Sequence, residues 1–180
     1  MLKRLILITF SFLLSFNMAL ADDLKIAFVD IDGIISQSIA GKEITKTLNN
    51  LNNKNSKKFK EKEKKLVDEE NNIIKQKNIL SKEELDIKIK TLQGNVINFK
   101  KDVNIARADL DKKRLEATAK LINVLNIILS EYSKKNSISL IIQKKNIVIG
   151  KTELDITSQI LKLVNAKIKN VKLNWCQKTD

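Results

Sequence analysis

The 180-residue sequence contains no proline, no histidine, a single cysteine and only four glycines. Without proline, nothing in the chain forces a long helix to break. Without histidine, the usual general base and metal ligand near neutral pH is missing. The one cysteine, Cys176, cannot form an intrachain disulfide, and the glycines form no glycine-rich loop. We therefore predict that the protein is not an enzyme, with no catalytic residues, no metal site and no cofactor.

A 3.5-residue apolar repeat between Leu85 and Ile128 is the strongest pattern that the sequence does contain. Steps of four and three residues alternate, which marks a narrow apolar stripe on one helix and is typical of a coiled coil. At about 1.5 Å per residue such a helix is roughly 65 Å long, longer than a domain of this size is wide. The stripe begins with Leu85, Ile89, Leu92, Val96, Phe99, Val103, Ala106 and Leu110.

An earlier stripe with a similar repeat predicts a second helix before this one. Between the two, Ser81 and Glu84 have the spacing of a capping box, in which each side chain accepts a hydrogen bond from a backbone amide at a helix start. A short reversal here folds the second helix back onto the first. The sequence thus predicts an antiparallel hairpin with arms at 42–79 and 82–119.

The first 21 residues have the features of a signal peptide. Lys3 and Arg4 precede an apolar core, Leu5 to Leu14, and Ala19-Leu20-Ala21 forms an A-x-A cleavage site. A membrane anchor is the alternative, but it needs about 20 apolar residues, and polar residues interrupt this stretch. We expect the mature chain, residues 22–180, to be exported and soluble, without a lipid anchor because the residue directly after the cleavage site, Asp22, is not a cysteine.

The chain is strongly basic, with a formal net charge of +13 at pH 7. This sign of charge suits nucleic acid, anionic lipid headgroups or acidic polypeptides as partners. Export argues against nucleic acid, which we do not expect to bind. Because Lys, Asn and Ile are abundant throughout, a simple compositional bias also explains the charge.

Two short motifs resemble parts of enzyme sites. Asp30-Ile31-Asp32-Gly33 is similar to the nucleophile motif of haloacid-dehalogenase-type phosphatases. Those enzymes need a doubly wound sheet, whereas the segment that follows here is predicted to be helical, so we interpret the motif as an acidic strand end and turn. The end of a phosphate-binding loop is similar to Ile149-Gly150-Lys151-Thr152, but Lys145 stands where that loop needs its first glycine. We therefore do not expect nucleotide binding.

The segments on either side of the hairpin predict a small body. Residues 24–30 suit a buried strand, and two further short strands are expected at 138–143 and 146–150, with a tight turn between them. Asn136 is expected in the left-handed position after the second arm, and Asp155 should cap a last helix. So few short strands are not stable in one chain, and their open edges favour association.

On these residues the chain resembles the Skp/OmpH family of periplasmic chaperones. The most specific matches are Lys25-Ile26-Ala27-Phe28-Val29-Asp30, Ser38-x-Ala40-Gly41-Lys42 and Asp155-Ile156-Thr157. The resemblance implies an α+β fold and a prefoldin-like homotrimer, in which strands of three chains build the body and three coiled-coil hairpins hang from it like tentacles. Family members hold unfolded outer-membrane proteins between these arms without ATP. The implied function is a holdase in the periplasm of a Gram-negative bacterium.

This interpretation divides the chain into a signal peptide, a trimerisation body, an arm and a tail. The tail contains Trp175 and Cys176, and we read the cysteine as incidental, with an intermolecular bridge as the alternative. The boundaries are 1–21 for the signal peptide, 22–41 and 120–169 for the body, 42–119 for the arm and 170–180 for the tail.

Aliphatic residues off the predicted seam are candidates for contact with clients. Scattered exposed apolar residues are common, however, so incidental exposure or packing between chains stays open. Gly94, inside the second arm, is either a flex point or a product of drift. The candidate client-binding residues are Val67, Ile74, Ile87, Ile97, Ile105 and Leu115.

An exported coiled-coil adaptor is the alternative function. Such a protein would bind one folded partner or an anionic surface, and anionic lipid and lipopolysaccharide are further candidate partners. An adaptor would not suppress the aggregation of a denatured outer-membrane protein, whereas a chaperone would.

Overall fold

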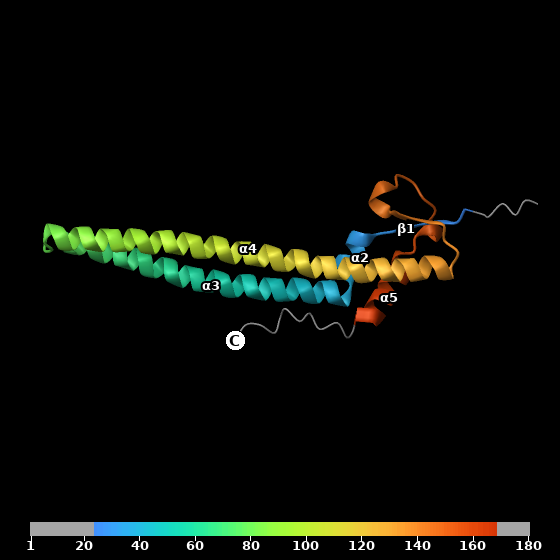
Figure 1. Cartoon of the computed structure of the whole chain (residues 1–180), viewed down its shortest axis with the longest axis horizontal. Helices are drawn as coiled ribbons and strands as arrows, with labels where there is room; N and C mark the ends of the chain where they lie inside the picture. The colour runs from blue at the N-terminus through green and yellow to red at the C-terminus, as the bar shows by residue number, and fades with distance from the viewer. Residues whose placement is uncertain (1–23, 169–180) are drawn as a thin grey trace, which may run out of the picture.

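The computed structural model describes residues 24–168 (Figure 1). It is mostly helical with a small parallel sheet, which confirms the predicted α+β class. The predicted signal peptide and the tail with Trp175 and Cys176 lie outside the described residues. In chain order the elements are β1 (Ile26–Val29), α2 (Ile31–Gln37), α3 (Ile39–Gln76), α4 (Lys82–Lys135), β2 (Leu140–Gln143), the 3-10 turns η1 (Lys144–Asn146) and η2 (Thr152–Leu154), and α5 (Thr157–Ile168).

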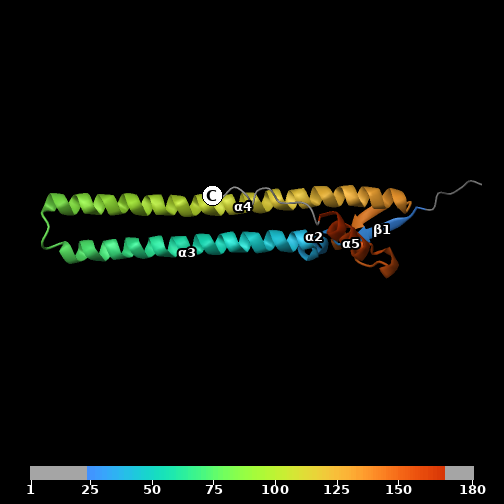
Figure 2. The same cartoon turned by 90° about the horizontal axis from the view of Figure 1, so that it is seen from below.

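The predicted hairpin is confirmed. Helices α3, 38 residues long, and α4, 54 residues long, lie side by side and project far beyond the body in both views (Figures 1 and 2). The capping box forms at the reversal: the amide of Glu84 donates to Ser81 Oγ at 3.2 Å, and the amide of Ser81 donates to Glu84 Oε2 at 3.0 Å. The pKa of Glu84 is lowered because the Ser81 amide and, at 2.9 Å, the Ser81 hydroxyl both donate to Glu84 Oε2.

Helix α2 between strand β1 and the first arm was missed from the sequence. Asp30 is its N-cap, because Asp30 Oδ1 accepts the Gly33 amide at 2.7 Å. Ser38 then caps α3 and is fully buried, accepting the Gly41 amide at 3.1 Å. A Cβ on Gly41 would stand 1.6 Å from the carbonyl oxygen of Ile35, so only glycine fits where the two helices meet.

The sheet joins the chain segment before the hairpin to the segment after it. Strands β1 and β2 pair in parallel, with Ile26 opposite Leu140 and Val29 opposite Gln143. Asp155 bridges to the other side of β1 at Phe28. The buried core surrounds this sheet and the base of the arms, and consists of Ala27, Val29, Ile34, Ile44, Leu48, Ala117, Leu121, Leu125, Ile128, Ile156, Ile160 and Val164.

The predicted strand at 146–150 is wrong. Residues 144–146 form the turn η1, and no strand follows before α5 in the described part of the chain. The predicted tight turn lacks the Asn-Gly type of sequence that a two-residue hairpin prefers. Instead, Lys144 Nζ lies 2.7 Å from Asp155 Oδ2 and 5.9 Å from the centre of the Phe28 ring, which ties the turn back to β1.

The end of α4 differs from the prediction by one residue. Asn136 has φ −105°, whereas Ser137, with φ 53°, takes the left-handed position. The amide of Ile138 donates to the Ser133 carbonyl at 2.9 Å and that of Ser137 to the Lys134 carbonyl at 3.4 Å. This is a Schellman motif, which satisfies the last carbonyls of the helix and turns the chain toward β2.

None of the helices in the described part carries an apolar stretch long enough to cross a membrane.

Candidate functional site

The seam between the two arms is thin. Between Leu48 and Ala117, Ile73 is the one buried residue of this described segment, at 8% exposure, and the other seam residues are mostly half-buried. Phe59 and Phe99 meet across the seam edge to face, with ring centres 6.0 Å apart. Two helices alone cannot enclose an apolar stripe, so most of this stripe remains reachable from the side.

One flank of the seam is closed by polar contacts between the arms. We call it the bonded flank. The hydrogen bond and charge of Lys62 lower the pKa of Asp102. Contacts at exposed sites such as these contribute little stability, but they cover the seam on this side. The contacts are Lys62 Nζ to Asp102 Oδ2 at 2.8 Å, Asn95 Nδ2 to Glu69 Oε2 at 3.5 Å, and Lys88 Nζ to Gln76 Oε1 at 3.2 Å.

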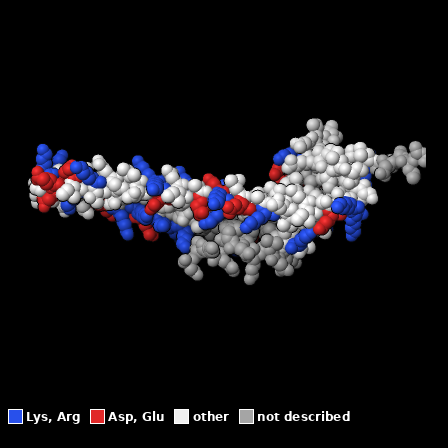
Figure 3. Space-filling view, viewed as in Figure 1, with Lys and Arg blue, Asp and Glu red and all other residues white. Residues whose placement is uncertain are grey.

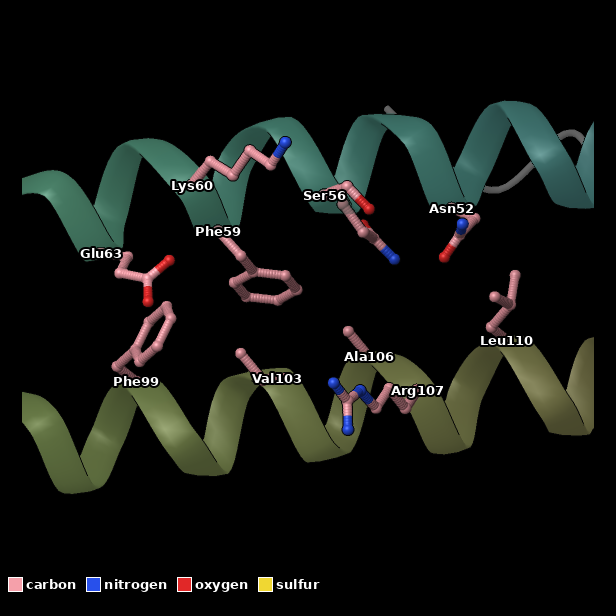
Figure 4. A pocket seen from close by; sticks show the side chains of 11 residues that line it. Asn52, Ser56, Phe59, Lys60, Glu63, Phe99, Val103, Ala106, Arg107 and Leu110 are labelled. Atoms are coloured by element: carbon pink, nitrogen blue, oxygen red, sulfur yellow. The ribbon is translucent and has the colours of Figure 1, made fainter.

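The opposite flank is hollowed, and we call it the open flank. Hollows of about 370, 600 and 420 Å³ follow one another from the tip toward the body. They adjoin, because the first two share Leu92 and the second and third share Phe99. In the hollow nearest the body, Phe59 points from α3 toward Val103 and Phe99 of α4 (Figure 4). The open flank is therefore a continuous, largely apolar groove along the arms.

Three of the six candidate client-binding residues line this groove. Val67 and Ile97, 48% and 66% exposed, lie in the middle hollow, and Ile74, 63% exposed, lies in the one nearest the tip. Their side chains come from both arms. The structure thus brings these three residues to one surface.

The other three candidates are exposed but lie elsewhere. Ile87 and Ile105 are 18 residues apart, which is five turns of helix, so they share one face of α4, and neither lines a hollow. Leu115 lies nearer the body than the last hollow. That the second-arm candidates form one client-binding face stays a prediction: Ile97 lines the groove, whereas Ile87, Ile105 and Leu115 line none of the three hollows.

The sequence analysis missed the contribution of the seam itself. Residues assigned only to helix pairing, such as Leu92, Val96 and Phe99, also form the floor of the groove. The signal was present in the length of the stripe, since a long two-helix seam without a third helix leaves its edges uncovered.

Charges of both signs border the groove. Lys60 and Arg107 stand at the hollow near the body, and Glu63 and Glu70 lie along the middle hollow with Lys100. On the face seen in Figure 3, basic and acidic side chains are interspersed along the arm with uncharged surface between them. A bound chain would therefore meet apolar surface inside a hydrated, charged rim.

The acidic motif after β1 has a structural role. Asp30 caps α2, and Asp32 Oδ2 lies 3.5 Å from Lys145 Nζ.

Asp155 is a second acidic residue with a structural role. Burial by itself would raise the pKa of Asp155, but hydrogen bonds from Lys144 and Thr157 outweigh it and lower that pKa. Within residues 24–168, no three His, Cys, Asp or Glu side chains gather as a metal ion would require.

Comparison with known proteins gives two matches. A family model described as "Outer membrane protein (OmpH-like)" matches residues 25–164. The fold is similar to the crystal structure of a proposed OmpH-like outer membrane chaperone from Caulobacter crescentus CB15, with a TM-score of 0.77 and 14% sequence identity over 82% of this chain and 88% of that one. Among curated proteins, none matches the sequence.

Proposed function

The chain belongs to the OmpH-like family, and from this we propose that it is an ATP-independent holdase chaperone of the periplasm, which captures unfolded outer-membrane proteins and prevents their aggregation. The chaperones of this family are periplasmic and are not enzymes. Export by the predicted signal peptide at residues 1–21 is part of the proposal.

The open flank is the observation that carries this proposal. A holdase needs apolar surface that stays hydrated and is spread over a length of chain, so that many weak contacts add up to retention. The groove provides this, since its hollows adjoin along the arms and the exposed side chains of Val67, Ile74 and Ile97 project into them. Release then needs no ATP, because each contact is weak and a folding client withdraws its apolar residues.

Electrostatic attraction would bring clients to the arms. The chain carries 34 Lys and Arg against 21 Asp and Glu. Clients with a net negative charge would meet this field before any apolar contact forms, which raises the association rate. Capture by charge and retention by apolar contact are therefore separate steps.

The proposal includes a homotrimer formed through the body. A sheet of two strands is too small to be stable alone, and β2 has β1 as its one neighbour in the described sheet. Beyond β2, Val148 and Ile149 are 98% and 91% exposed, which is costly for adjacent aliphatic residues in a monomer. Partner chains would cover both the strand edge and these side chains.

Two measurements test the proposal. The purified protein should suppress the aggregation of a urea-denatured outer-membrane protein after dilution, without ATP. Light scattering coupled to size exclusion should give three times the chain mass. A protein that binds no denatured client but retains a folded partner would instead be a coiled-coil adaptor.

The tip of the arms favours a second candidate function, contact with an anionic surface. Ile79 is 83% exposed at the tip, between Lys77 and Lys82. An exposed aliphatic residue flanked by lysines suits anionic lipid or lipopolysaccharide. Sedimentation with anionic vesicles, compared between the native protein and Ile79→Ser, distinguishes this from client binding.

A further inference from the structure

A second groove lies in the body, between the end of α4 and α5. Its volume is about 540 Å³. Ile128, 2% exposed, contributes to its floor, and Leu163, 43% exposed, to its wall. Lys167 Nζ lies 3.1 Å from both carboxylate oxygens of Glu131, so an ion pair borders the groove. The lining residues are Ile128, Glu131, Tyr132, Lys135, Asn136, Leu163, Ala166 and Lys167.

The chain leaves the described part at the rim of this groove. Helix α5 ends at Ile168, directly after Lys167, which lines the groove. Residues 169–180 follow, and their apolar residues Val171, Leu173 and Trp175 alternate with Asn and Lys. The family match ends at residue 164, so these residues lie outside the matched range.

The dimensions of segment and groove agree. In an extended segment, alternate side chains share one face at roughly 6.7 Å spacing, so Val171 to Trp175 would cover about 13 Å. Along α4, the distance from Ile128 to Asn136 is about 12 Å at 1.5 Å per residue. Trp175 stands seven residues beyond Ile168 and can reach about 23 Å from it, which includes the whole groove.

We infer that residues 169–180 dock in this α4–α5 groove of their own chain, with Val171, Leu173 and Trp175 against its apolar floor. The segment would cover Leu163 and extend the core of the body at the base of the arm. This inference does not depend on the chaperone function, because it concerns the body and not the open flank.

Trp175 is the only tryptophan of the protein, so its fluorescence reports directly on the inference. Leu163→Lys puts a charge in the groove and should displace the segment. In the native full-length protein we therefore expect Trp175 emission to be blue-shifted, and its quenching by acrylamide to be several-fold weaker than in Leu163→Lys. Leu115→Lys is the matched control, since Leu115 is 71% exposed on the arm and outside the groove. Quenching that is equally strong in all three proteins would overturn the inference.

Cys176 allows a second test, because it is the only cysteine. With Lys135→Cys at the end of the groove, mild oxidation should give an intrachain disulfide, whereas Lys90→Cys, far out on the arm, should not. Disulfides only between chains would show that a second copy fills the groove and would overturn docking within the chain. Weaker client retention by Leu163→Lys without any change at Trp175 would assign the groove to clients and would also overturn it.

Discussion

Replacing Ile74 and Ile97 together by serine should weaken client retention more than replacing Ile87 and Ile105. All four residues are exposed isoleucines, at 63% and 66% on the open flank and 63% and 57% elsewhere on the arms. The two variants therefore lose the same atoms, and only the first pair lines the groove. Serine and isoleucine have similar helix propensities, so neither variant should unfold the hairpin.

The exposed fractions set the size of the effect. Full burial of an isoleucine side chain contributes about 1.5–3 kcal/mol. Since about two thirds of each open-flank side chain is still exposed, a client that covers both would gain about 2–4 kcal/mol. That corresponds to about 30- to 700-fold in affinity, as an upper limit, because a client can shift to neighbouring hollows.

Fluorescence anisotropy of a labelled, denatured outer-membrane protein measures the dissociation constant and the dissociation rate. The pair Ile74→Ser and Ile97→Ser should raise the dissociation rate at least about tenfold, and the pair Ile87→Ser and Ile105→Ser should leave it nearly unchanged. Circular dichroism and molar mass should be native in both. An equal loss in both pairs, or a larger loss in the second, would show that the groove does not hold the client.

Three further predictions follow from other parts of the structure. Gly94→Ala should raise the free energy of unfolding by about 1 kcal/mol, because a Cβ there meets nothing within 4 Å. Gly41→Ala should lower the free energy of unfolding, because its Cβ would collide with the Ile35 carbonyl. Urea denaturation measures both changes. The rate of client capture should fall as salt rises, since exposed charges are screened beyond about 8–10 Å at 0.1–0.15 M, and stopped-flow mixing that gave a salt-independent rate would refute the electrostatic step. The pKa of Asp155 is lower in the folded protein than in the unfolded chain, so ionised Asp155 stabilises the fold at a pH above its unfolded pKa. This stabilisation is lost as the pH falls below about 4. The free energy of unfolding of Asp155→Asn should therefore fall less steeply with acid than that of the native protein.

The hairpin could be predicted from the sequence because its causes are local. The 3.5-residue repeat fixes which residues face the other helix, and Ser81 with Glu84 fixes where the second helix begins. The identity of the candidate residues as exposed aliphatics followed from the same period, and all six of them are exposed. Periodicity says which residues lie off the seam, but not which of its two flanks is open.

The tertiary structure decided the remaining features because they depend on segments far apart in the chain. The parallel pairing of Ile26 with Leu140 needs the whole hairpin to return the chain, and the close approach at Gly41 needs two helices to meet. The difference between the flanks has the same origin: the rotation and axial register of α3 against α4 bring Lys62 to Asp102 on one side and leave hollows on the other. A helical repeat is unchanged by such shifts, so the sequence alone determines the arms and their stripe, whereas the packing of one arm on the other determines where a client could bind.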